Sequence, residues 1–174
     1  MRRVEVSAYQ PKWKDLFEQE ARRLCQLFGS VILDIHHIGS TSVLGLHAKP
    51  IIDIMPVVQD IEKVDAFHDD MIQLGYEPKG EFGISGRRYF PKGGEERTHH
   101  VHMFQTGSPH IERHLAFRDF LRTHPDVAKQ YGWLKTDLAQ RYPENMNGYI
   151  EGKNDFVQTT EKRALEWYQN SRTN

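Results

Sequence analysis

Two stretches of the chain carry side chains that suit phosphate and metal chemistry. Gly39, Ser40, Thr41 and Ser42 follow a strand-like run and place backbone N–H groups and hydroxyl groups at one bend. Such a bend can hold the oxygens of a phosphate, although serine and threonine also cap ordinary turns. Asp53 lies thirteen residues after Ser40, inside an apolar run. A carboxylate in such a run is costly to bury unless a cation pairs with it, so Asp53 is a candidate metal ligand, with a structural ion pair as the alternative.

Two histidines extend this interpretation. His100 and His102 are two residues apart in the strand-like run 98–105, so their side chains should share one face of a strand. Neutral imidazoles at this spacing can bind a transition metal. Together with Asp53 they would form a two-histidine, one-carboxylate set that suits zinc, manganese or iron at least as well as magnesium. The alternative is a polar groove in which these histidines only form hydrogen bonds.

Three basic residues are candidates for binding phosphate. Lys49 precedes Asp53, while Arg87 and Arg88 follow a glycine-rich segment. Each side chain can neutralise phosphate oxygens, and arginine can do so through two parallel hydrogen bonds. The simpler alternative is that all three are solvated surface groups. The predicted phosphate-binding set is therefore Gly39, Ser40, Thr41, Ser42, Lys49, Arg87 and Arg88, and the predicted metal ligands are Asp53, His100 and His102.

The first part of the chain alternates between helical and strand-like patterns. Apolar residues recur at helical spacing from Trp13 to Phe28, where Gly29 suits a C-terminal cap, and this spacing also predicts that Cys25 is buried. Asp60 is a suitable cap for a helix that reaches Leu74. The expected strands cover residues 31–38, 51–58, 87–90 and 98–105, with the last two joined as a hairpin by a turn at 91–94.

From Ser108 onward the pattern is helical. Ser108-Pro109 and His124-Pro125 are typical helix starts, and residues 145–148 are predicted as a loop before a last helix. We therefore predict one α/β (α+β) domain over residues 1–174. Its sheet core, residues 1–107, should be a mixed sheet of four to five strands with packed helices, and residues 108–174 should form a helical extension.

Composition excludes several classes of protein. The 23 basic and 24 acidic residues give a net charge of −1, so no overall positive field attracts nucleic acid. A single cysteine, Cys25, excludes an internal disulfide framework and a cysteine-based zinc site. No signal-peptide pattern and no apolar run of ~18 residues is present. The sequence therefore predicts a cytoplasmic protein without a membrane segment.

Two motifs at a fixed spacing resemble the GrpB family, a group within the polymerase-β-like nucleotidyltransferase superfamily. They are IGSTSV at residues 38–43 and AKPIIDI at residues 48–54, with Gly45-Leu46 between them and a weaker match at residues 114–122. The resemblance implies a nucleotidyltransferase-type sheet, a Gly-Ser turn that holds nucleotide phosphates and an Asp-x-Asp pair that holds two magnesium ions. Here Asp53 matches the first acid, but Met55 stands at the second, and Leu44 stands where the family suggests a proline.

Three functions follow from the resemblance and the residues. The first is binding of a nucleotide or related phosphate compound with a divalent metal (Mg or Mn, with Zn as an alternative), with Asp53 as the catalytic residue if a nucleotidyl group is transferred. The second is a catalytically inactive module for a nucleotide or a coenzyme-A metabolite, which the loss of an acid at Met55 favours; family members also occur joined to dephospho-coenzyme A kinase. The third is a metal-dependent hydrolase that uses Asp53, His100 and His102.

Overall fold

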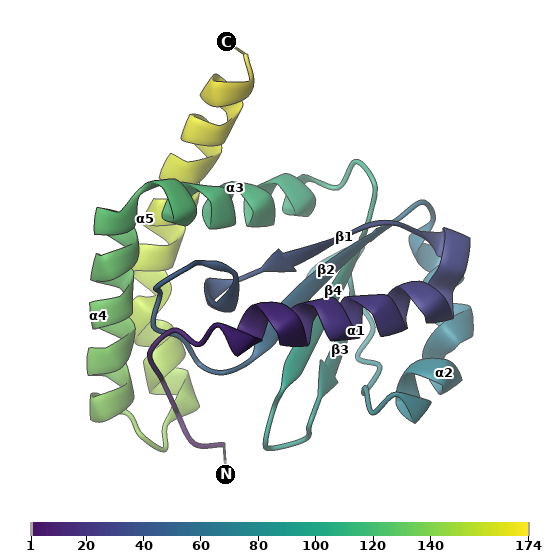
Figure 1. The fold of residues 1–174 in the computed structure, drawn as a ribbon, viewed down its shortest axis with the longest axis horizontal. Helices are drawn as coiled ribbons and strands as arrows, with labels where there is room; N and C mark the ends of the chain where they lie inside the picture. The colour runs from purple at the N-terminus through teal and green to yellow at the C-terminus, as the bar shows by residue number, and fades with distance from the viewer. Residues whose placement is uncertain (1, 174) are drawn as a thin grey trace. The chain divides into compact units, whose positions relative to one another are not determined.

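The computed structural model describes residues 2–173 and contains one four-stranded sheet. Its strands are β1 (Ile32–Ile38), β2 (Ile52–Val58), β3 (Arg88–Lys92) and β4 (His99–Gln105). They lie in the order β1-β2-β4-β3 (Figure 1). β2 and β4 are parallel, whereas the β1–β2 and β3–β4 pairs are antiparallel. The predicted mixed sheet with packed helices and a helical C-terminal part is confirmed.

In the part of the chain that the structure describes, five α-helices accompany the sheet, and short 3₁₀ segments connect several elements. The helices are α1 (Lys12–Phe28), α2 (His68–Gln73), α3 (Pro109–Thr123), α4 (Pro125–Arg141) and α5 (Met146–Arg172). The 3₁₀ segments are Gly29–Val31, Ser40–Ser42 and Ile61–Phe67. Among the residues that the structure describes, no helix is both long and apolar enough to cross a membrane.

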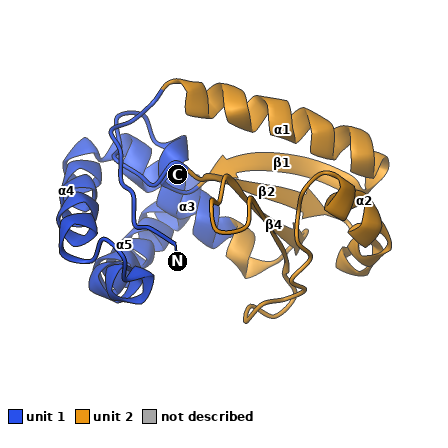
Figure 2. Cartoon of the chain, turned by 90° about the horizontal axis from the view of Figure 1, so that it is seen from below, with its two compact units in different colours: residues 1–10, 39–50, 112–174 blue, residues 11–38, 51–111 orange. Residues whose placement is uncertain are grey.

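The chain divides into two compact units (Figure 2). We call residues 11–38 and 51–111 the sheet unit. The helical unit contains the described residues of segments 1–10, 39–50 and 112–174. The 39–42 bend therefore belongs to the helical unit, whereas all four strands belong to the sheet unit.

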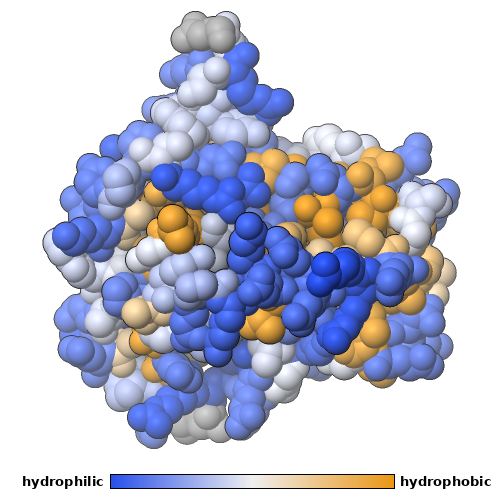
Figure 3. All heavy atoms as spheres, viewed as in Figure 1, coloured by the Kyte–Doolittle hydropathy of each residue, from blue (hydrophilic) through white to orange (hydrophobic). Residues whose placement is uncertain are grey.

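In the sheet unit, α1 packs on one face of the sheet because its apolar residues recur on one side. Leu24 and Phe28 are buried, Phe17 stacks on His37 of β1 at 4.7 Å between ring centroids, and Phe28 contacts Phe67 at 4.5 Å. The outward side of α1 is polar, and Figure 3 shows hydrophilic residues over it. This packing turns His37 toward the helix, so alternation places Ile38 and its strand partner Asp53 on the opposite face of the sheet.

In the helical unit, α3, α4 and α5 enclose an apolar core. Phe120, Tyr131 and Ala164 are buried in it, and Val43 and Leu46 of the 39–50 segment join them. Gly152 lets α5 approach α4 closely, because a Cβ atom there would lie 2.4 Å from a methyl group of Leu138. The segment that carries the 39–42 bend is therefore anchored by its apolar residues to the helices of this unit.

Several predicted boundaries are wrong for local reasons. Residues 61–67 form a 3₁₀ segment instead of the predicted α-helix, and the side chain of Asp60 accepts a hydrogen bond from the N–H of Glu62 at its start. The predicted loop at 145–148 is the beginning of α5, because the side chain of Asn145 caps this helix through the N–H of Gly148. Cys25 is exposed instead of buried, since neighbouring Leu24 occupies the buried side of α1.

The hairpin boundaries also differ from the prediction. β3 begins at Arg88 and continues through Pro91 to Lys92, so the expected turn at 91–94 starts only at Gly93. Pro91 is tolerated there because a proline lacks only the backbone N–H, and its carbonyl still accepts a hydrogen bond from the N–H of Glu77. The pairing of β3 with β4 as a hairpin is confirmed.

Candidate metal centre

Asp53, His100 and His102 converge on one face of the sheet. Each offers one ligand atom, and these atoms all lie within 4.8 Å of one another. The Oδ1 atom of Asp53 is 3.0 Å from Nε2 of His102 and 3.5 Å from Nδ1 of His100. The predicted metal-ligand set is therefore brought together inside the sheet unit.

Strand pairing explains this convergence. β2 and β4 are adjacent and parallel, with Asp53 directly opposite His100. His102 follows at the two-residue period and projects from the same face. Apolar neighbours such as Ile54 and Val101, which alternate with these residues, are fully buried on the face that packs against α1. The polar residues therefore gather on the face away from α1.

The protonation states suit metal binding. Burial raises the pKa of Asp53, but hydrogen bonds and charge interactions with His100 and His102 outweigh it, so this carboxyl has a pKa well below its usual range. Burial lowers the pKa of His102, and the nearby Asp53 carboxylate opposes this effect only in part. Asp53 is therefore ionised and His102 neutral at pH 7, which are the forms of these groups that bind metals.

The accessibility of the three side chains is also suitable. Their exposed fractions are 27% for Asp53, 18% for His100 and 13% for His102, so an ion can reach them from solvent. The Nε2 atom of His100 is buried without a hydrogen-bond partner among the described residues. Two histidines and one carboxylate fit zinc, manganese or iron and leave coordination positions open for a further ligand. Met55, at the position of the second family acid, is fully buried and adds no hard oxygen ligand.

Arg87 and Tyr89 surround the histidines. Nη1 of Arg87 is 3.4 Å from Nδ1 of His102, and the guanidinium lies 4.7 Å from the centre of the Tyr89 ring. That ring is 5.3 Å from the ring of His102. If Arg87 donates to Nδ1, then Nε2 carries the His102 proton toward Asp53, so metal binding through Nε2 requires this proton to move to Nδ1. Sequence reasoning found Arg87 but missed Tyr89, although the two-residue period places both on one face.

Arg88 has a different environment from Arg87. Adjacent strand residues point to opposite faces, and Arg88 donates two hydrogen bonds to Asp65, at 2.7 and 3.2 Å. It pairs with Met103, on the face that packs against α1. Of the two predicted arginines, only Arg87 is thus brought to the Asp53 face.

The predicted phosphate bend and Lys49 lie in the helical unit. Gly39 has a positive φ of 73° at the start of the bend, and the hydroxyl of Ser42 donates to the carbonyl of Gly39. Thr41 and Ser42 are buried. The ammonium of Lys49 lies 3.7 Å from the sulfur of Met146 and 5.2 Å from the centre of the Tyr149 ring.

The lowered pKa of His102 predicts acid sensitivity of the metal-free protein. Unfolded His102, with an ordinary pKa of 6.5, takes up a proton that the folded side chain resists, so its contribution to folding stability is lost as the pH falls below that value. The free energy of unfolding, measured with urea and EDTA between pH 7 and 5, should fall less steeply in His102→Gln than in the wild type. Exposed His47→Gln should keep the wild-type slope, and equal slopes for His102→Gln and wild type would contradict the prediction.

A family model, a curated protein and a solved structure that are similar to this chain carry the names GrpB or UPF0157. The family model described as "GrpB protein" matches residues 3–163. The UPF0157 protein YqkA of Bacillus subtilis is 52% identical over 166 residues, which cover 95% of this chain and 48% of that protein. The chain thus spans about half of YqkA. The crystal structure of conserved protein GrpB from Enterococcus faecalis has 48% sequence identity and a TM-score of 0.92, covering 95% of this chain and 99% of that chain. A protein named dephospho-CoA kinase from Mycobacterium tuberculosis is 26% identical over 183 residues, which cover 90% of this chain and 45% of that protein.

Proposed function

The chain belongs to the GrpB family, and we propose that it binds a nucleotide or related phosphate compound with the help of a divalent metal ion. The observation that carries this proposal is the convergence of Asp53, His100 and His102, whose ligand atoms lie within 4.8 Å of one another. The ion would supply positive charge for phosphate oxygens at its open coordination positions. The family motif that contains Asp53 supports the same assignment.

The residues around the metal ligands have separate roles in this proposal. Asp53 supplies the negative charge that holds the ion, and the neutral imidazoles supply the other two donor atoms. Arg87 adds a positive charge on the same face, although this residue is buried and its Nε and Nη2 atoms already donate to the carbonyls of Glu81 and Phe82. The 39–42 bend and Lys49, in the helical unit, stay a separate prediction of phosphate binding that rests on their place in the family motif.

The number of carboxylates in the site favours ligand binding over nucleotidyl transfer. A two-metal transfer site needs several hard oxygen ligands, and Asp53 is the one carboxylate in the cluster formed by the described residues. If transfer occurs, Asp53 is the catalytic residue that we expect it to require. The hydrolase alternative would use the same three residues, and the release of inorganic phosphate from a phosphate ester would support it.

A coenzyme-A metabolite is the second ligand candidate. It is favoured by the similarity of 90% of the chain to part of a protein named dephospho-CoA kinase. Dephospho-coenzyme A carries a nucleotide and a pyrophosphate, so the same metal-assisted contacts would bind either compound class.

Metal removal tests the proposal directly. Protein purified without a histidine tag and stripped with EDTA should bind Mn²⁺ or Zn²⁺ saturably in calorimetry. The loaded protein should then bind ATP or dephospho-coenzyme A at least about tenfold more tightly than the stripped protein. ATP turnover would add catalysis to the assignment. Absence of metal binding at millimolar concentration, or equal ligand affinity with and without metal, would overturn the proposal.

A further inference from the structure

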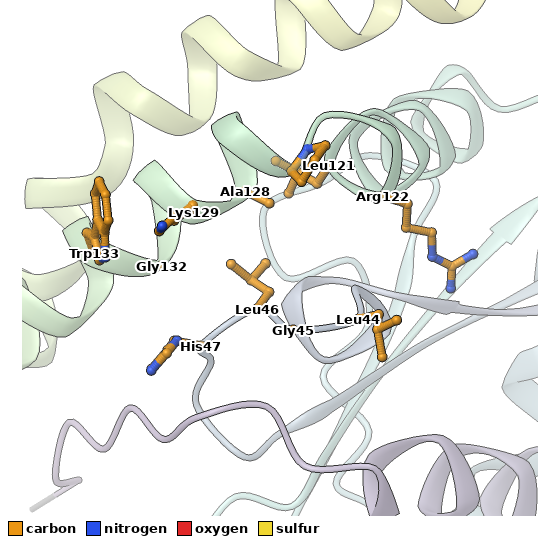
Figure 4. Close-up of a pocket in the computed structure, with 11 residues that line it drawn as sticks. Leu44, Gly45, Leu46, His47, Leu121, Arg122, Ala128, Lys129, Gly132 and Trp133 are labelled. Carbon is orange, nitrogen blue, oxygen red and sulfur yellow. The ribbon is translucent and has the colours of Figure 1, made fainter.

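The helical unit contains a cavity that is separate from the metal ligands. It has a volume of about 370 Å³ and lies between the 44–47 segment and the end of α3 with the first half of α4 (Figure 4). Sites for small molecules typically have volumes of roughly 300–1,000 Å³. All of its lining residues belong to the helical unit.

The walls of this cavity are mainly apolar. Leu46 and Leu121 are buried in the core of the unit, whereas Leu44 and Trp133 are 81% and 62% exposed. Residues of α4 line the cavity because they recur three and four positions apart and share one side of the helix. Two large apolar side chains at the rim are thus left in contact with water, and a ligand with an apolar body would cover them.

The charged residues of the lining are all basic. Arg122 and Lys129 contribute two cations, and no carboxylate lies among the lining residues within 2–173. The Nε atom of Arg122 donates to the carbonyl of Ser42 at 2.9 Å, which orients the guanidinium, and Asp119 is 4.0 Å from its Nη1 atom. The ammonium of Lys129 lies 5.1 Å from the centre of the Trp133 ring.

The charges and the aromatic ring are arranged along the length of the cavity. Figure 4 shows Arg122 at one end and Trp133 with Lys129 at the other, with Leu44 and Leu46 between them. A ligand that fits this arrangement has an aromatic ring, an uncharged spacer and an anionic group. A phosphate monoester has a charge near −2 at pH 7 and three acceptor oxygens, so it suits the guanidinium of Arg122 at that end.

We propose that this cavity is a second binding site, for a phosphate monoester with an aromatic ring such as a nucleoside monophosphate. The ring packs at the Trp133 end, the spacer lies over Leu44 and Leu46, and the phosphate faces Arg122. This site needs no metal ion and does not rest on the function proposed for Asp53, His100 and His102.

The test uses the 174-residue chain in EDTA, with AMP as the probe and tryptophan fluorescence and calorimetry as readouts. Wild type should bind AMP saturably, adenosine at least about tenfold more weakly, and Asp53→Asn should bind AMP as the wild type does. Trp133→Phe should lose most of the fluorescence change while calorimetry still detects AMP. Absence of saturable AMP binding at millimolar concentration would overturn the proposal.

A matched pair of variants at Leu44 localises the site without disturbing the core, because this side chain is 81% exposed. Leu44→Glu places a negative charge in the lining and should weaken AMP binding about tenfold at low salt, whereas Leu44→Lys should not weaken it. Arg122→Met should lower AMP affinity to that of adenosine. If the Glu and Lys variants bind AMP equally, the cavity is not the binding site.

Discussion

The Asp53→Asn variant is expected to lose at least about 100-fold in affinity for Mn²⁺ or Zn²⁺, which corresponds to about 2.7 kcal/mol. Asparagine preserves the shape of the side chain and can still accept a hydrogen bond from His102. It removes the negative charge of Asp53, whose carboxylate is the only one in the cluster formed by the described residues. Two neutral imidazoles and an amide supply no negative charge to balance the charge of a dication. Calorimetric titration of metal into stripped protein measures the difference.

A matched control on the neighbouring strand separates this effect from a general change in charge. Asp34 lies on β1 with a side chain that is 65% exposed, and its carboxylate is 3.2 Å from His36. Asp34→Asn should change the metal affinity less than about threefold. His99→Gln, on β4 but on the opposite face from His100 and His102, should behave in the same way. Similar losses in Asp34→Asn and Asp53→Asn would show that the titrated ion does not bind at the three predicted ligands.

The sequence predicted the elements of this candidate site better than their register. Alternation within β4 placed His100 and His102 on one face, and this is what the structure has. The pairing of Asp53 with His100 depends on the parallel register of β2 and β4, for which the two sequences contain no turn or spacing signal. Arg87 and Arg88 were predicted together because both are basic. Only the register and the packing of α1 decide which of them shares a face with Asp53.

The cavity in the helical unit was missed for a similar reason. Its lining joins residues 44–47 to α4, more than 75 positions later in the chain, and apolar periodicity does not reveal which loop packs on which helix. A weak signal was present, since Pro125, Lys129 and Trp133 recur four residues apart on α4. The exposed Leu44, noted only as a departure from the family, lies at this same cavity. A residue that departs from a family motif can thus indicate a binding surface as well as the loss of a catalytic group.

Glu20→Ala is expected to lower the free energy of unfolding by about 3 kcal/mol and to leave metal affinity unchanged. Glu20 is buried in α1, and its Oε1 accepts hydrogen bonds from Tyr76 at 2.7 Å and Lys92 at 3.1 Å. Burial raises the pKa of Glu20, but the hydrogen bonds from Tyr76 and Lys92 outweigh it, so the carboxylate stays ionised. Removal of this carboxylate leaves Tyr76 and Lys92 without this acceptor. Metal affinity should not change because Glu20 lies on the α1 face of the sheet, opposite Asp53.

Two control variants, Glu20→Gln and Glu18→Ala, make this prediction specific. Urea unfolding at pH 7 should give a smaller loss for Glu20→Gln, about 1 kcal/mol, because the amide oxygen still accepts one hydrogen bond. Exposed Glu18→Ala on the same helix should change the free energy by less than about 0.5 kcal/mol. If Glu20→Ala lost metal affinity to the extent expected for Asp53→Asn, the two faces of the sheet would be coupled, and the assignment of stability to the α1 face and of binding to the other would fail. Separate losses, of stability in one variant and of metal binding in the other, would establish that the structural carboxylate of α1 and the metal-binding carboxylate of β2 act independently on opposite sides of the sheet.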